Sequence, residues 1–256
     1  MRLKLLFVLT IAALSACGGL ERIPKLTVPR EDLLTAYRLM AEGDQMFVDG
    51  REHFALLKYL EASRLNPYHE VIFNRLAMAF SRVRQFRQAD EAVKRAIRLE
   101  PEYPFAHNTR GIIYLATRYN RQAIRSFKEA IRLKPEEASF YLNLGHAYVR
   151  DDEYQEGMRT YQMALQIDPE IFQRTDVIEL SYEFADAANP ERFYQMARIF
   201  AELGDKDTCL EYLGKALSAG FSDSRRLMSD AAFEKLREDT EFVKLIASYG
   251  IVESNS

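Results

Sequence analysis

Apolar residues along this chain recur at the three- and four-residue spacing of amphipathic helices, and the alternating pattern of strands is absent. One such helical stretch contains Ala89, Ala92, Val93, Ala96 and Ile97. Stretches of this kind are followed by a proline every 34 residues, at Pro67, Pro101, Pro135 and Pro169. Because proline cannot continue a helix, each one marks a helix end. The pattern predicts an all-α chain with a 34-residue period.

Residue size follows the same period. In frames that start at Ala36, Glu70, Pro104 and Ala138, positions 8, 20 and 27 are small and position 24 is apolar and larger. Position 8 is Gly43, Ala77, Gly111 and Gly145, and position 20 is Ala55, Ala89, Ala123 and Gly157. Position 24 is Tyr59, Val93, Phe127 and Tyr161, and position 27 is Ala62, Ala96, Ala130 and Ala164. We interpret positions 8 and 20 as the places where two helix backbones approach most closely.

This order of small, small, large, small and proline resembles the tetratricopeptide (TPR) repeat. The resemblance covers residues 34–169 as four units and implies a right-handed solenoid of helix-turn-helix repeats. One helix pair cannot bury its apolar face alone, so neighbouring units must stack. Residues 190–221 resemble a degenerate fifth unit, in which Phe221 stands in the place of the proline. Residues 222–250 resemble the C-terminal helical cap that closes many bacterial TPR proteins.

Two segments fall outside the period. Residues 170–189 are predicted to form an irregular linker, with a short helix within 177–188. Residues 251–256 are predicted to be a disordered tail. The domain organisation is therefore one solenoid with an interruption before its last unit.

The first 16 residues are predicted to be a signal peptide. Arg2 and Lys4 precede an apolar stretch, Leu5 to Leu14, that is too short to span a bilayer. The stretch ends in Leu-Ser-Ala-Cys, which resembles the cleavage box of bacterial lipoproteins and implies lipid attachment at Cys17. An ordinary signal peptide followed by a chance cysteine is the alternative.

The residue after the lipidated cysteine bears on location. In two-membrane bacteria an aspartate there commonly retains a lipoprotein in the inner membrane, so Gly18 implies the outer membrane, facing the periplasm. Residues 17–33 are predicted to be the lipidated cysteine and a polar tether. The other cysteine, Cys209, occupies position 20 of the fifth unit and is expected to be buried.

Charge and chemistry exclude several function classes. The formal charge is −3 and basic runs are absent, which gives no electrostatic reason to bind nucleic acid or anionic lipid. The four histidines, His53, His69, His107 and His146, lack the spacing of a metal site. No phosphate-binding loop or nucleophile elbow occurs. We therefore expect no metal, no cofactor and no enzymatic activity, with an unrecognised active site as the alternative.

The resemblance implies a concave surface lined mainly by the first helix of each unit, where TPR proteins bind a protein or peptide. The positions carried over for this partner groove are Asn74, Met78, Arg82, Phe105, Asn108, Ile112, Leu115, Leu142 and His146. The same positions also give Asp44, Phe47, Val48 and Arg75. Exposed apolar patches usually mark partner sites, and the amides of Asn74 and Asn108 could bond an extended peptide backbone.

Alternatives stay open for this groove. Asn74 and Asn108 are equally interpretable as local helix-surface residues. Met40 and Asp44 stand where TPR proteins that hold chaperone C-termini have lysine and asparagine, so a carboxylate clamp is not expected. The groove could also be filled by the tether or the C-terminal segment.

These features together predict a lipid-anchored TPR scaffold that assembles proteins in the bacterial envelope. The alternative within the same resemblance is a regulator that docks cell-wall enzymes such as peptidases.

Overall fold

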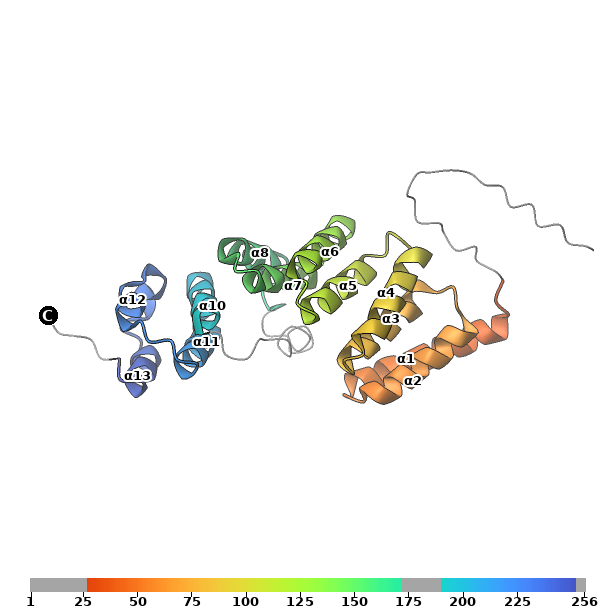
Figure 1. Cartoon of the computed structure of the whole chain (residues 1–256), viewed down its shortest axis with the longest axis horizontal. Helices are drawn as coiled ribbons and strands as arrows, with labels where there is room; N and C mark the ends of the chain where they lie inside the picture. The colour runs from red at the N-terminus through yellow and green to blue at the C-terminus, as the bar shows by residue number, and fades with distance from the viewer. Residues whose placement is uncertain (1–26, 172–189, 252–256) are drawn as a thin grey trace, which may run out of the picture.

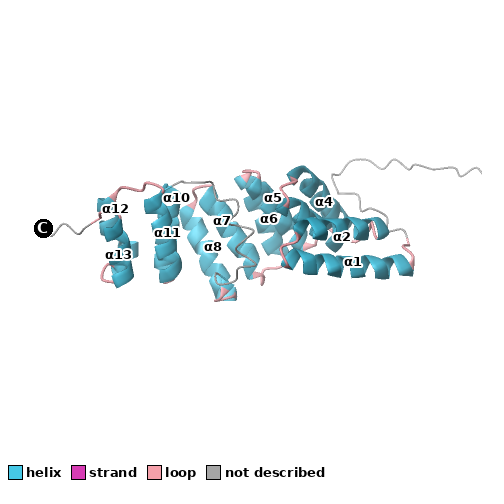
Figure 2. Cartoon of the chain, turned by 90° about the horizontal axis from the view of Figure 1, so that it is seen from below, coloured by secondary structure: helices cyan, strands magenta, loops and turns pink. Residues whose placement is uncertain are grey.

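The computed structural model describes residues 27–171 and 190–251, and every regular element in these two ranges is a helix. The helices stand in successive pairs along an elongated molecule (Figures 1 and 2). The first eight are α1 (Arg30–Val48), α2 (Glu52–Leu65), α3 (Glu70–Arg82), α4 (Phe86–Leu99), α5 (Pro104–Ala116), α6 (Asn120–Leu133), α7 (Ala138–Arg150) and α8 (Tyr154–Ile167). The C-terminal part contains α10 (Pro190–Leu203), α11 (Lys206–Ser218), α12 (Ser224–Ser229), the 3₁₀ helix η2 (Ala231–Leu236) and α13 (Thr240–Ser248).

The all-α solenoid is confirmed. Each odd-numbered helix from α1 to α7 packs against the next helix in sequence, and each second helix then packs against the first helix of the following unit. The second helices end at Leu65, Leu99, Leu133 and Ile167, two residues before the four periodic prolines. Pro67 and its equivalents therefore stop the helices as predicted. The signal peptide, Cys17 and the expected helix within 177–188 lie outside the described residues.

The small residue at position 8 makes room for the ring at position 24. A Cβ added to Gly43 would lie 2.7 Å from Cε1 of Tyr59. A Cβ on Gly111 or Gly145 would overlap the ring of Phe127 or Tyr161 in the same way. We expected the approaching backbone to require the small residue at position 8. That reason is wrong, because the nearest atoms belong to a side chain.

The second unit shows the same relationship in a relaxed form. Its position 24 is Val93, which is shorter than a ring, and its position 8 is Ala77 rather than glycine. Position 20 of the fourth unit meets both kinds of atom: a Cβ on Gly157 would lie 2.8 Å from Cγ2 of Val149 and 3.4 Å from the carbonyl oxygen of Gly145. The period thus encodes two different close contacts.

One turn residue in each unit has a left-handed backbone. With φ between 60° and 80°, these residues are Gly50, Arg84, Arg118, Asp152 and Gly204. The first four are 34 residues apart, at the turn between the two helices of each unit. This conformation costs a non-glycine residue about 1 kcal/mol. Three of the five units therefore place a strained residue where glycine would be relaxed.

The chain ends differ from expectation at two points. Helix α1 begins at Arg30, so residues 30–33 belong to a helix and not to the predicted tether. Pro29 precedes this helix, and the acids Glu31 and Asp32 in its first turn favour the positive end of the helix dipole. At the other end Ile251 is buried and its N–H bonds the carbonyl of Ile246, so the predicted disordered tail is wrong at this residue.

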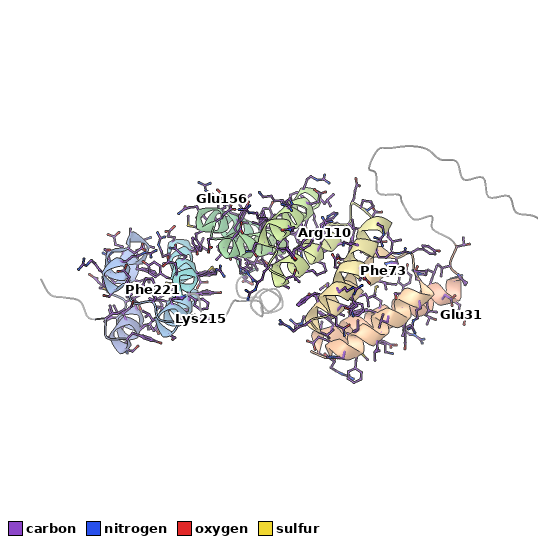
Figure 3. All side chains as sticks on the ribbon, viewed as in Figure 1. Glu31, Phe73, Arg110, Glu156, Lys215 and Phe221 are labelled. Atoms are coloured by element: carbon purple, nitrogen blue, oxygen red, sulfur yellow. The ribbon has the colours of Figure 1, made fainter. Side chains whose placement is uncertain are left out.

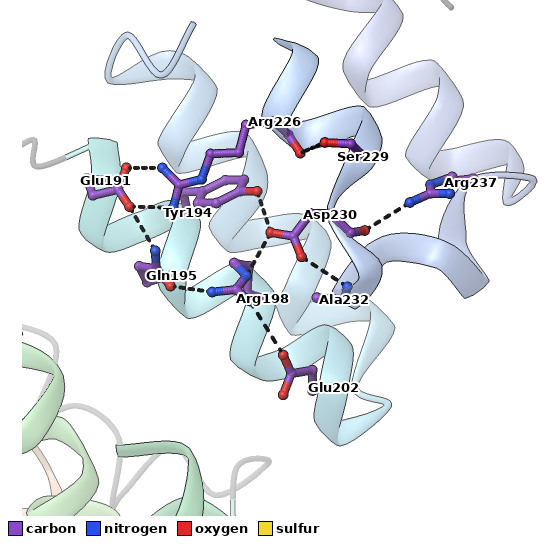
Figure 4. Close-up of polar contacts among 10 residues, drawn as sticks. All are labelled: Glu191, Tyr194, Gln195, Arg198, Glu202, Arg226, Ser229, Asp230, Ala232 and Arg237. Carbon is purple, nitrogen blue, oxygen red and sulfur yellow. Dashed lines mark hydrogen bonds and ion pairs between the residues drawn. The ribbon is translucent and has the colours of Figure 1, made fainter. Parts of the chain in front are cut away.

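Helix α10 and the cap are joined by one polar network (Figure 4). The hydroxyl of Tyr194 on α10 donates to Asp230 at 2.6 Å, and Arg198 pairs with the same carboxylate at 2.7 Å. Arg226 on α12 pairs with Glu191 through two 2.9 Å bonds and lies over the Tyr194 ring. The network therefore fixes α12 and η2 onto α10.

Apolar contacts complete this end of the molecule. The ring of Phe221, which replaces the proline, stacks on Tyr194 with centroids 4.2 Å apart. Cys209 is fully buried in the same cluster, as predicted, and burial raises the pKa of its thiol to about 12. The thiol is therefore protonated and chemically unreactive at neutral pH.

Candidate functional site

The predicted groove residues lie on α3, α5 and α7, the first helices of the second, third and fourth units. Side chains cover the whole row of helices (Figure 3). Those predicted groove residues that are partly exposed are Met78, Arg82, Phe105, Asn108 and His146. The others, Asn74, Ile112, Leu115 and Leu142, are buried.

The exposure expected for these four residues is wrong, and the reason is packing between neighbouring units. Ile112 and Leu115 belong to one apolar cluster with Leu144 and Tyr148 of the next unit. Leu142 is buried in the C-terminal cluster. The apolar character of the middle first helices therefore reflects the core of the solenoid, so these residues do not form an exposed patch.

The described part of the chain has a partly open pocket at the first two units, lined by side chains of α1, α2 and α3. Its volume is about 310 Å³ and its lining residues are Asp44, Phe47, Val48, Tyr59, Arg75 and Met78. All of these except Tyr59 occupy positions carried over to the concave surface from the repeat pattern. Tyr59 was missed because position 24 was interpreted as a core position only.

Polar groups meet at one side of this pocket. The Tyr59 hydroxyl donates to Oδ1 of Asp44 at 2.6 Å, and Nε of Arg75 lies 2.9 Å from the same oxygen. Burial, with the Asp44 hydrogen bond, holds the pKa of Tyr59 far above its usual range. Tyr59 therefore remains a donor at all accessible pH values, and Asp44 is held between a donor and a cation.

The opposite walls are apolar. Phe47, Val48 and Met78 line them, and Val48 is 81% exposed at the rim. The Met78 sulfur also lies 3.9 Å from the amide nitrogen of Asn74 and from Nη1 of Arg75. Pockets with apolar walls and a few convergent polar groups are the usual form of binding sites.

In the middle of the predicted groove, the side chains contact other residues of the same chain more than those of the pocket do. Phe105 packs edge-on against Phe140 with centroids 5.4 Å apart, and the ammonium of Lys134 lies 4.9 Å from its ring centre. The amide of Asn143 donates to Oδ1 of Asn108 at 3.0 Å. The sequence had suggested that Asn74 and Asn108 present two equivalent free amides. They do not, because Asn74 is buried and Asn108 bonds Asn143.

His146 repeats the geometry of the pocket in the fourth unit. Its Nδ1 lies 2.7 Å from the Tyr161 hydroxyl, and the two rings meet edge-on. Burial, helped by the nearby Arg150 charge, lowers the pKa of His146 to about 4. The imidazole is neutral at pH 7, so its Nδ1 can accept a hydrogen bond from the Tyr161 hydroxyl, as Asp44 accepts one from Tyr59 in the first unit.

The described ranges contain neither a metal-binding cluster nor a membrane-spanning helix. Within residues 27–171 and 190–251, no group of three His, Cys, Asp or Glu side chains is arranged so that it could hold a metal ion. None of the helices there has the length and apolar character needed to cross a membrane.

Known proteins resemble the chain in both sequence and fold. A TPR repeat family model matches residues 120–152, and a tetratricopeptide repeat model matches residues 138–171 and 190–219. No curated protein matches the chain. The TPR protein TTC0263 from Thermus thermophilus is 20% identical, with a TM-score of 0.53, and the match covers 77% of this chain and 98% of that one.

MamA from Desulfovibrio magneticus RS-1 is 17% identical with a TM-score of 0.48, over 74% of this chain and 97% of that one. At such identities the structural likeness concerns the fold alone. The matched family models, the 34-residue period and the paired helices agree with one another. The chain therefore carries tetratricopeptide repeats arranged as an all-helical solenoid.

Proposed function

We propose that this chain is a lipid-anchored TPR scaffold that binds a protein or peptide in the bacterial envelope. The observation that carries the proposal is the pocket lined by α1, α2 and α3, because it combines an apolar wall with a fixed polar pair on a repeat fold. Solenoids of this kind act through extended surfaces of their stacked helices.

The pocket supports a particular kind of ligand. Its apolar wall, formed with Phe47 and Met78, suits an aliphatic or aromatic side chain. The Asp44 carboxylate and the Arg75 guanidinium can each form a further hydrogen bond to a peptide backbone or a polar neighbour. We therefore expect the ligand to be a peptide segment in which one aliphatic or aromatic side chain is flanked by polar groups.

The anchor is supported by the N-terminal sequence. Arg2 and Lys4, the apolar stretch after them and the Leu-Ser-Ala-Cys box together favour export and lipid attachment at Cys17. Gly18 favours the outer membrane. A chain held in this way would bring its partner to the periplasmic side of the membrane.

The pocket is tested by one change at its rim. Val48→Glu places a charge in the apolar wall, and because Val48 is exposed the fold should be retained. Leu57→Glu is the matched control, since Leu57 is also exposed but does not line the pocket. A partner captured from solubilised membranes should be lost with Val48→Glu and kept with Leu57→Glu. Equal capture by both variants would refute the pocket.

The anchor has a separate test. Cys17→Ser should abolish lipid attachment and leave an unprocessed or freely soluble product, as followed by membrane fractionation. Mass spectrometry of the mature N-terminus should find acyl chains on Cys17 in the unaltered protein. An unmodified Cys17 there would refute the anchor without affecting the pocket.

A further inference from the structure

Basic residues repeat with the 34-residue period on the second helices of two units. Arg84, Arg87, Lys94 and Arg98 accompany α4, and Arg118, Arg121, Lys128 and Arg132 stand one full period later on α6. Arg125 adds a fifth cation to the second set. We call these nine residues the basic rows. Their members are far apart in sequence, so they form no basic run.

The spacing places each row on one helix face. From Arg121 to Arg132, successive members on α6 are three or four residues apart, which is the spacing of neighbours along one side of a helix, whereas Arg118 lies in the turn before α6. All nine are exposed except Arg98, which is partly exposed. Helix α5 packs against both α4 and α6, so the two rows belong to adjacent units (Figure 1).

Charge is concentrated there. Residues 84–99 and 118–133 contain ten basic and three acidic side chains, a net charge of +7. The whole chain carries −3, so the other residues together carry −10. The equivalent positions of the fourth unit are Asp152, Gln155, Gln162 and Gln166, so the rows end at α6.

Only part of this charge is neutralised within the molecule. Lys94 pairs with Asp90 at 2.6 Å and Arg132 pairs with Glu129 at 2.7 Å. Arg87 and Arg121 make longer pairs of 3.6 Å with Glu91 and Asp151. Arg98, Arg125 and Lys128 make no ion pair with any side chain in the described ranges, and the Lys128 ammonium lies 5.3 Å from the ring centre of Tyr148. These three cations have no carboxylate partner there and can bind an external anion.

The surface between the rows does not resemble a protein interface. Such interfaces have an apolar centre from which charged residues are depleted. On α4, α6 and the turns that precede them, Tyr119 is the one large apolar side chain that is strongly exposed. A surface dominated by arginine and lysine suits an array of phosphates better.

We propose that the basic rows bind the phosphate-bearing surface of an anionic phospholipid bilayer. The choice of lipid as the anion rests on the proposed envelope location, whereas the rows themselves do not depend on the anchor or on the pocket. Basic clusters beside a membrane anchor are attracted to anionic lipids within a Debye length of the surface.

The length of chain between Cys17 and α1 bears on whether the basic rows can face the bilayer. Twelve residues separate Cys17 from Arg30, and twelve extended residues span up to about 40 Å. Helix α1, with 19 residues, is about 28 Å long. The chain before α1 can therefore extend further than the length of α1 itself, so an anchor at Cys17 would not hold α1 directly against the bilayer.

The test uses the full chain after residue 16 with Cys17→Ser, so that no lipid is attached and failure of the anchor cannot affect the result. Co-sedimentation is measured with vesicles of phosphatidylglycerol and phosphatidylcholine in equal parts, and with phosphatidylcholine alone. The row variant is Arg98→Glu, Arg125→Glu and Lys128→Glu. The control variant, Arg64→Glu, Arg225→Glu and Lys244→Glu, changes the net charge equally, and Arg64 lies one period before Arg98.

We expect binding to the anionic vesicles alone, weakened by added salt. The row variant should bind at least about tenfold more weakly, and the control variant should bind like the parent chain. Circular dichroism would verify that both variants fold. Equal loss in the two variants, or no preference for anionic vesicles, would overturn the proposal. A short DNA duplex bound through the rows in place of vesicles would also overturn it.

Discussion

The hydroxyl of Tyr161 lies 2.7 Å from Nδ1 of His146, and the hydroxyl of Tyr59 lies 2.6 Å from Asp44 in the same two repeat positions. In both units a tyrosine at position 24 reaches an acceptor at position 9, fifteen residues earlier. Where position 24 is apolar, position 9 is apolar too: the pairs are Met78 with Val93 and Ile112 with Phe127. In these four units the polarity of position 9 therefore follows the polarity of position 24.

The imidazole of His146 predicts a pH-dependent stability. The pKa of His146 is about 4 in the folded chain and about 6.5 when unfolded. Between these values the unfolded chain binds the additional proton, so the free energy of unfolding should fall as pH drops from 6.5 to 4. The loss amounts to about 3 kcal/mol for a difference of this size. Urea unfolding at a series of pH values would measure it.

His146→Gln is the control for this effect. Glutamine retains an acceptor for Tyr161 and does not titrate. Burial also lowers the pKa of His107. In the variant, the free energy of unfolding should therefore still fall with decreasing pH, but less steeply. An unchanged slope in the variant would show that His146 is not the group responsible.

The contact between positions 8 and 24 predicts a coupled pair of substitutions. Gly111→Ala should destabilise the fold by about 1–3 kcal/mol, because the added Cβ overlaps the Phe127 ring. Combining it with Phe127→Val imitates the natural pair Ala77 and Val93, so the double variant should be more stable than the two single losses predict. Denaturant midpoints of the three variants give the coupling energy. Simple additivity would contradict the contact.

The polar network at the C-terminal end predicts a large effect from one carboxylate. Asp230 accepts from Tyr194, pairs with Arg198 and caps η2 through the N–H of Ala232. Asp230→Ala should cost roughly 3 kcal/mol, because it leaves these partly buried groups without their partner. Glu234→Ala, an exposed acid in the same segment, should change stability by less than about 0.5 kcal/mol. Similar melting temperatures for the two variants would argue against the network.

The left-handed turn predicts a stabilising substitution. Arg84→Gly should raise stability by up to about 1 kcal/mol, because glycine adopts φ near 60° without strain. Arg87→Gly, inside α4, should lower it by about 1 kcal/mol through the poor helix propensity of glycine. Thermal unfolding of both variants would show whether each substitution raises or lowers the stability. A loss of stability with Arg84→Gly would mean that the arginine itself stabilises the turn.

The sequence predicted the fold well because its period records contacts that every unit shares. Gly43 and Tyr59 in one unit, and Gly111 and Phe127 in another, meet within a single helix pair, so spacing alone identifies them. The groove was predicted less well. Ile112 and Leu142 are buried by neighbouring units, and the pattern within one unit does not carry that information.

The basic rows were missed for a related reason. Arg87 and Arg121 lie 34 residues apart, so neither the net charge nor a search for consecutive basic residues detects them. They lie on the second helices of adjacent units, and only the repeat arrangement relates them. A surface property of a repeat protein must therefore be sought at the repeat period.

The joining of α10 to the cap also limits how such an array can change in length. A solenoid grows by duplication of a unit, and an open end would accept a new helix pair directly. Here Tyr194 is enclosed by Phe221 and Asp230, so an added pair beyond α11 would have to displace both. An insertion before Pro190 would leave these contacts intact, because Tyr194, Phe221 and Asp230 would stay together on its C-terminal side.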